Sequence, residues 1–189
     1  MKTFNIVIVG VGGQGLITLA MIIAESAMKS GFDIKTSELH GLSQREGSVK
    51  VEVRFGSKVW SPLAPQGKAD LVLALESQEA LAGAYFADKN TSFLINQKQV
   101  PTLEKSISEK EILDNLKKIS KNIELIPASK TCEKKFGSEA PAGIYLLGRA
   151  LAKKLLPLSE KSIISAIKKI LPKKHWNLNL KTLKLANSL

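Results

Sequence analysis

Two short segments near the N-terminus hold the residue types that could do chemistry. The first follows an apolar run directly and consists of Gly10, Val11, Gly12, Gly13, Gln14 and Gly15. The second runs from Ser37 to Gly47 and contains Glu38, His40, Gln44 and Arg45. Each follows an expected strand, and in an open α/β sheet such loops leave from one edge, where ligands bind. We therefore expect the two segments to lie together.

The glycine segment fits the pattern G-x-G-x-x-G at the first turn from strand to helix. Its glycines, Gly10, Gly12 and Gly15, allow a tight turn and a close approach of backbone to a ligand. The N-terminus of the following helix offers free N–H groups and a positive dipole to a phosphate or carboxylate. Tight packing of strand on helix also needs small residues, so nucleotide binding and packing both stay open. A kinase-type P-loop is excluded because no Lys-Ser/Thr follows the last glycine.

The second segment is more crowded than a simple ribose contact requires. An NAD site needs an acidic residue at the end of the second strand, and Glu38 lies near that place. Arg45 suits a bidentate contact with a carboxylate or phosphate, or an ion pair with Glu46. His40 suits proton transfer or a structural, solvent-facing role, and Gln44 suits a polar contact or an ordinary loop role. Neither an activated nucleophile nor a base with an orienting partner is visible, so we predict no catalytic residue in this chain.

Cysteine and histidine are too sparse for a metal centre. Cys132 is the only cysteine, whereas an iron–sulfur cluster needs about four thiolates. His40 and His175 are far apart in the sequence and have no ligand-like spacing, so no protein-held metal is expected. Cys132 is expected to be a bystander, and the lysines beside it would lower the pKa of its thiol.

The sequence patterns around these segments predict an α/β protein. An apolar run at 4–9, a helical pattern at 14–30 and a strand at 32–37 form a βαβ unit. Strict alternation at 48–55 predicts a half-exposed antiparallel strand. Further strands are expected at 58–60, 70–75, 92–96 and 122–126. Helices are expected at 77–87, 142–156 and 159–171, and one more after the Ser108/Glu111 capping box. The predicted fold is Rossmann-like: a mostly parallel sheet with helices on both faces and an antiparallel hairpin. We expect one domain, 1–189, with a C-terminal helical and tail segment, 141–189, whose apolar end is docked.

The net charge of +11 is carried by one half of the chain. Residues 1–95 contain nine basic and nine acidic residues, whereas residues 96–189 contain 19 basic and eight acidic residues. A solvated lysine-rich face explains this, and so does attraction to an anionic partner subunit or polyphosphate cofactor. Nucleic acid is not expected, because no binding motif or interleaved aromatics are present. No stretch reads as a membrane span or signal peptide, which predicts a cytoplasmic location without a membrane partner.

The two segments together resemble the gamma-type subunits of 2-oxoacid:ferredoxin oxidoreductases, and most of all the indolepyruvate-type small (beta) subunit. The stretches 60–65 and 69–76 support the resemblance, which covers nearly the whole chain and is strongest over 5–80. Leu42, Ser43 and Glu46 depart from the loop Gly-Met-Ala-Gln-Arg-Gly-Gly that is common in the family, and Tyr145 replaces a frequent asparagine. Glu46 sets a negative charge beside Arg45 and removes a glycine.

The resemblance implies a division of labour between subunits. A large partner carries thiamine diphosphate and iron–sulfur clusters, the oxoacid is oxidatively decarboxylated, electrons pass to ferredoxin, and coenzyme A takes the acyl group. This chain then holds no cofactor alone, is inactive alone, and faces the partner's thiamine and coenzyme A region. The implied cofactor-facing residues are Gly10, Gly12, Gly13, Gln14, Gly15, Glu38, His40, Gln44 and Arg45. A subunit for pyruvate, 2-oxoglutarate or branched-chain oxoacids, a stand-alone nucleotide-binding protein, and a homodimer of the isolated chain stay open.

Overall fold

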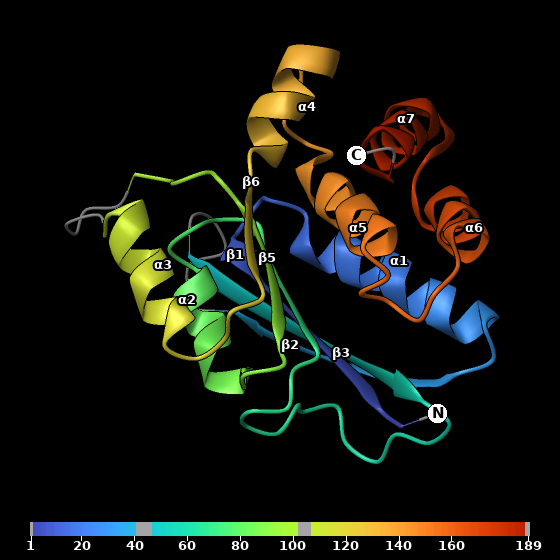
Figure 1. Cartoon of the computed structure of the whole chain (residues 1–189). Coiled ribbons are helices and arrows are strands. Elements are labelled where there is room, and N and C mark those ends of the chain that lie inside the picture. The colour runs from blue at the N-terminus through green and yellow to red at the C-terminus, as the bar shows by residue number, and fades with distance from the viewer. Residues whose placement is uncertain (1, 41–46, 102–106, 188–189) are drawn as a thin grey trace.

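A six-stranded mixed sheet forms the centre of the described residues, which in this computed structural model are 2–40, 47–101 and 107–187 (Figure 1). The strand order is β2-β3-β1-β4-β5-β6. Strands β1, β4, β5 and β6 are parallel, and β3 pairs antiparallel with both β1 and β2. The strands span Phe4–Val11 (β1), Asp33–His40 (β2), Ser48–Gly56 (β3), Leu71–Ala74 (β4), Ser92–Asn96 (β5) and Ile123–Ile126 (β6). This confirms the predicted fold class, and the antiparallel hairpin is formed by β2 and β3.

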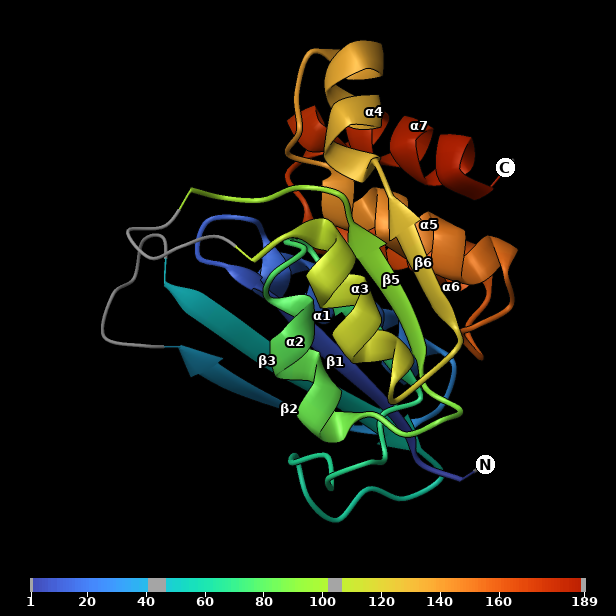
Figure 2. The same ribbon diagram turned by 60° about the vertical axis from the view of Figure 1, so that its left-hand side comes forward.

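Helices cover both faces of this sheet (Figure 2). One face carries α1 (Leu16–Lys29), α5 (Ala142–Ala152), α6 (Glu160–Ile170) and α7 (Trp176–Asn187). The other carries α2 (Ala80–Gly83), the 3-10 turn η1 (Ala84–Phe86) and α3 (Glu109–Lys117). A second 3-10 turn, η2 (Lys173–His175), leads into α7, and α4 (Ala128–Phe136) follows β6. Among these residues no helix has the length and apolar character to span a bilayer.

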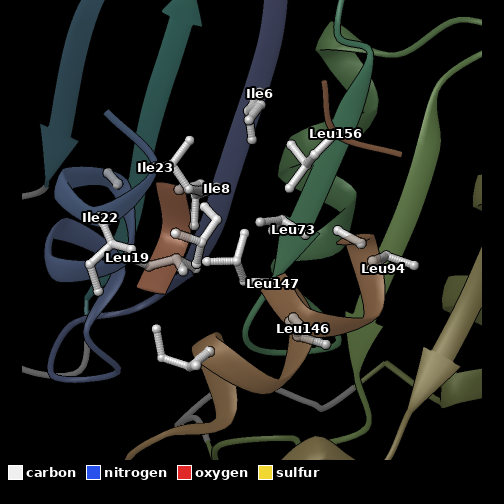
Figure 3. Close-up of a cluster of buried hydrophobic side chains, with 14 of the residues drawn as sticks. Ile6, Ile8, Leu19, Ile22, Ile23, Leu73, Leu94, Leu146, Leu147 and Leu156 are labelled. Atoms are coloured by element: carbon white, nitrogen blue, oxygen red, sulfur yellow. The ribbon is translucent and has the colours of Figure 1, made fainter. Parts of the chain in front are cut away.

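Residues 6–9 of strand β1 are all apolar because both faces of the strand are buried there. Ile6 and Ile8 belong to the buried cluster on the side of α1 and α5, where Figure 3 shows Ile8 beside Ile23 and Leu147, while Val7 and Val9 belong to the cluster under α2 and α3. All four side chains are fully buried, and each buried side chain of this size contributes about 1.5–3 kcal/mol. The core thus fixes the strand whose carboxyl end carries the glycine turn.

One prediction around β3 is wrong and one is confirmed in part. Residues 58–60 form no strand, because the Val59 N–H donates to the Asp33 carboxylate (2.8 Å) instead of joining a ladder. On the second face of β3, Ser48 is exposed and Lys50 and Arg54 are half-buried, but Glu52 is buried, accepts a hydrogen bond from the Ala64 N–H (2.5 Å) and pairs with Lys50 (3.1 Å). A loop, 57–68, covers this face.

The helical predictions hold with three changes. The expected helix at 77–87 is shorter and splits into α2 and η1, and the helix at 142–156 ends at Ala152. The Ser108 cap is confirmed, since its hydroxyl accepts from the Glu111 N–H (3.2 Å). Helix α4 was not expected, because only Ala128, Ser129 and Cys132 of it are buried. The C-terminal tail docks as α7 on α5, as predicted for its described part.

Candidate functional site

The glycine turn and the second segment lie at one edge of the sheet. Val11 pairs with Ser48 and His40 pairs with Val49, so the last residues of β1 and β2 lie at the same edge. The Gly12 N–H donates to the Gly47 carbonyl (2.9 Å) and joins the two segments directly. This confirms their predicted proximity for the described residues. Gln44, Arg45 and Glu46 lie outside these residues.

Two kinds of glycine build the turn between β1 and α1. At Gly10 a Cβ would lie 2.7 Å from Gln14 Oε1 and 3.1 Å from Leu75 Cβ, so this glycine serves close packing. Gly13 (φ 95°) and Gly15 (φ 79°) adopt backbone angles that L side chains rarely reach, and a Cβ there would meet nothing within 4 Å. Gln14 Oε1 accepts from the Val11 N–H (2.9 Å) and braces the turn.

A cavity of about 410 Å³ opens at this edge beside the start of α1. Gly13, Gln14 and Gly15 line it, and no side chain caps the N-terminus of α1. Its other walls come from the carboxyl ends of β4 and β5, the starts of α4 and α5, and the segment that leads into α7; they include Leu75, Asn96, Lys98, Ser129, Glu139, Ala142, Gly143, Leu171, His175, Leu178 and Asn179.

Asn96 holds the floor of the cavity together. It is buried, and its amide nitrogen donates to the Leu75 carbonyl (3.0 Å) and to Ser129 Oγ (2.8 Å). Its amide oxygen accepts from the Ser129 N–H (3.0 Å). Every polar atom of this side chain is therefore used in joining β4, β5 and α4. At the rim, Lys98 and Glu139 form an ion pair.

Among the other described site residues, Glu38, Gly10 and Gly12 are not part of the cavity wall. Glu38 is an exposed residue of β2 and does not line the cavity, because β3 lies between β2 and β1. His40 ends β2 opposite Val49. Gly10 and Gly12 shape the turn without lining the cavity. Of the predicted site residues that the structure describes, Gly13, Gln14 and Gly15 lie at the cavity wall.

Sequence reasoning missed several wall residues because they come from distant parts of the chain. His175, Leu178 and Asn179 reach the cavity only through the docking of α7. A signal was available for Asn96, which ends β5, and for Lys98, which follows it, because both lie at the edge where the parallel strands end. Glu76 follows β4 in the same way; it accepts from the Glu79 N–H (2.8 Å), and burial raises the pKa of its carboxyl.

The pKa of the Cys132 thiol is raised, not lowered as its lysine neighbours suggested. The side chain is fully buried, and burial, with Glu139 adding to the effect, raises its pKa to about 11. The predicted lowering is wrong because the nearby Lys130, Lys134 and Lys135 are exposed. Within 2–40, 47–101 and 107–187, no three His, Cys, Asp or Glu residues gather as a metal site would need.

Residues 5–189 match the family described as pyruvate ferredoxin/flavodoxin oxidoreductase. The chain belongs to this family. It is 38% identical over 187 residues to the indolepyruvate oxidoreductase subunit IorB of Archaeoglobus fulgidus, covering 96% of this chain and 92% of the relative. The IorB subunit of Thermococcus kodakarensis is 33% identical, with 98% and 95% covered. The family resemblance is therefore confirmed.

Solved structures share the fold of this family member. The gamma subunit of a keto/oxoacid ferredoxin oxidoreductase from Geobacter sulfurreducens superposes with a TM-score of 0.71 at 22% identity, covering 98% of this chain and 96% of that one. The 2-oxoglutarate:ferredoxin oxidoreductase of Magnetococcus marinus superposes with a TM-score of 0.73 at 18% identity. The match covers 100% of this chain and 31% of that one. In that protein the fold is one part of a longer chain.

Proposed function

We propose that this chain is the small subunit of an indolepyruvate-type 2-oxoacid:ferredoxin oxidoreductase. The reaction converts an arylpyruvate, coenzyme A and two oxidised ferredoxins to acyl-coenzyme A, carbon dioxide, two reduced ferredoxins and one proton. The observation that carries the proposal is the 38% identity to an indolepyruvate oxidoreductase subunit across nearly the full length of both chains. The substrate class rests on the names of these relatives.

The redox cofactors belong to a larger partner in this proposal. A cluster needs about four thiolates, and this chain has one cysteine, which is buried. Thiamine diphosphate, when bound on the partner, supplies the carbanion stabilisation that decarboxylation requires. The small subunit supplies one wall of a shared site and is inactive alone. Its cytoplasmic location stays a prediction, as does its state of association when isolated.

The edge that carries the glycine turn is the surface proposed to face the partner's thiamine and coenzyme A region. The cavity, the uncapped N-terminus of α1 and the Lys98–Glu139 ion pair lie together there. N–H groups at a helix N-terminus suit an anionic group such as a phosphate. The proposed surface comprises Gly10, Gly12, Gly13, Gln14, Gly15, Glu38, His40, Gln44 and Arg45.

Variants at this edge test the surface. Arg45→Ala and Gly12→Val, each assembled with the large subunit, should raise the KM for coenzyme A or weaken assembly. If both variants assemble normally and keep the wild-type KM, the edge does not face that region. The substrate class is tested separately: kcat/KM for indolepyruvate should exceed the values for pyruvate and 2-oxoglutarate, and the reverse order would exclude an arylpyruvate enzyme.

A stand-alone nucleotide-binding protein is the second candidate, because the glycine motif opens onto a cavity. The strand order argues against it. A dinucleotide fold places its acidic residue on the strand next to β1, but here β3 occupies that position and Glu38 lies one strand farther away. Titration of the isolated chain with NAD, followed by Trp60 and Trp176 fluorescence, separates the two: tight binding would favour the stand-alone protein.

A further inference from the structure

The loop 57–68 lies at the end of the sheet opposite the candidate site (Figure 1). It starts where β3 ends at Gly56, and its Val59 N–H donates to Asp33, the first residue of β2. The glycine turn follows the other end of β1, and eight residues of strand span about 25 Å. The loop is therefore a surface separate from the cavity.

Three charged side chains fix the backbone of this loop. Asp33 accepts from the Val59 N–H (2.8 Å), and this bond holds the pKa of the Asp33 carboxyl below its usual value. Arg54 Nη1 donates to the Ser61 carbonyl (2.7 Å) and to the Leu63 carbonyl (2.8 Å). The buried Glu52 accepts from the Ala64 N–H (2.5 Å). A segment without regular secondary structure is thus held in one shape.

The side chains that this fixed backbone displays are apolar. Trp60 is 84% exposed, the most of the large apolar residues among those described, and Leu63 is 58% exposed. Tyr85, which is 60% exposed, adjoins the loop, since its carbonyl accepts from the Gly67 N–H (3.3 Å). The core does not use these side chains. Exposed aromatic and aliphatic groups on a rigid backbone are typical anchors of a protein interface, because little freedom is lost on binding.

The charge of the loop indicates which surface it fits. Residues 57–68 include Lys58 and Lys68 and no acidic residue, and Lys58 Nζ lies 5.0 Å from the centre of the Trp60 ring. A complementary surface is an apolar recess with carboxylates at its rim. A second copy of this loop does not fit, because it presents the same projecting tryptophan and the same lysines.

We propose that the loop 57–68 docks, with Trp60 as its anchor, into an apolar, carboxylate-rimmed recess of the large subunit. This rests on the proposed function, which supplies that partner. The fold comparison supports the choice of occupant: in the 2-oxoglutarate:ferredoxin oxidoreductase the same fold is 31% of a longer chain, so a larger body is attached to it there. In this proposal the large subunit, a separate chain, corresponds to that larger body.

A binding experiment with matched variants tests the anchor. We expect Trp60→Ala to weaken binding to the large subunit by about 30-fold, the effect of a central interface residue. Met28→Ala is the control, since Met28 is 51% exposed on α1, and it should bind within about twofold of wild type. Both variants should melt as wild type does, because neither side chain is buried.

Fluorine NMR reports on Trp60 directly. In a Trp176→Phe variant labelled with 5-fluorotryptophan, Trp60 gives the sole fluorine resonance. Unlabelled large subunit should shift this resonance. Wild-type affinity of Trp60→Ala, or an unchanged resonance at saturation, overturns the docking site while leaving the proposed function intact. If the isolated chain forms dimers and Trp60→Ala abolishes them, the loop binds a second copy of this chain instead of the large subunit. That result also overturns the proposed docking site. Failure of wild type to bind any large subunit would remove the proposed function itself.

Discussion

Gly10 shows how one missing side chain shapes the candidate site. A Cβ at this position would approach Gln14 Oε1 to 2.7 Å and Leu75 Cβ to 3.1 Å. Gly10→Ala should therefore push Gln14 away from the Val11 N–H, which that side chain now satisfies. We expect a loss of about 1–3 kcal/mol in the free energy of unfolding, measured by urea denaturation.

Gly13→Ala is the matched variant in the same turn. A Cβ at Gly13 would meet nothing within 4 Å, but φ is 95°, so its cost is backbone strain alone. The two alanines should differ in the NMR signal of the Val11 N–H, which moves in Gly10→Ala and stays in Gly13→Ala. Equal stability and an unchanged Val11 signal in Gly10→Ala would contradict the packing role.

Cys132 gives a prediction that depends on pH. Burial raises the pKa of its thiol to about 11, above the ordinary value of 9.0. The native state binds this proton more tightly than the unfolded state, so the thiol's contribution to stability is complete below pH 9 and falls as pH rises toward 11. Ellman's reagent should react with Cys132 at pH 8 only after unfolding by denaturant. Rapid reaction of the native chain would show an exposed thiolate.

At the scale of elements, the docking of α7 on α5 completes the cavity. A Cβ at Gly148 on α5 would lie 2.7 Å from Ala186 Cβ and 2.8 Å from the Leu183 carbonyl. Gly148→Ala should force the helices apart and destabilise the chain by about 1–3 kcal/mol in thermal or urea unfolding. If the proposed function is right, the same variant should raise the KM for coenzyme A in the assembled enzyme, because η2 and α7 carry His175 and Leu178 to the cavity.

Ala186→Gly provides the compensating change. It removes the 2.7 Å approach but leaves the Leu183 carbonyl, so the double variant should recover part of the loss and not all of it. Additive effects of the two substitutions would mean that Gly148 and Ala186 do not meet.

Elements with a strong local pattern could be predicted from the sequence, and elements made by distant contacts could not. Strand β5 and the capped α3 carry their own signals in apolar runs and in the Ser108 cap. Residues 58–60 look like a strand, but Asp33 takes the hydrogen bond that a strand would make, and nothing local reveals this. The site divides in the same way: the glycine turn is visible in its spacing, whereas His175 and Asn179 arrive from a helix about 160 residues away.

At the scale of the whole molecule, the sheet separates two surfaces. The carboxyl ends of the parallel strands carry the cavity, and the opposite end carries the loop 57–68. One partner that contacts both ends must extend along the sheet, which suits a subunit larger than this chain. The excess of positive charge is not confined to either face, since lysines lie on α3 as well as on α4, α6 and α7. A lysine can therefore attract a ligand at the cavity only if it lies near the carboxyl ends of the parallel strands.

Helices α3 and α4 allow a test of that charge with matched variants. Helix α4 starts at the carboxyl end of β6, where Ser129 lines the cavity, and its exposed lysines are Lys130, Lys134 and Lys135. The exposed Lys117, which ends α3, and the exposed Lys118 and Lys121, which follow it, precede the amino end of β6. Reversing either set to glutamate changes the net charge by the same amount, so only position differs.

If the proposed function is right, the α4 lysines attract the phosphates of coenzyme A, because charges within about 10 Å act through physiological salt and more distant ones are screened. The α4 triple variant should raise the KM for coenzyme A several-fold in the assembled enzyme at low salt, and the increase should shrink at 0.5 M salt. The α3 triple variant should keep the wild-type KM. Equal effects of the two sets would indicate attraction by net charge alone, and no effect of either would make the lysines a solvated face, which is the other interpretation that the sequence leaves open.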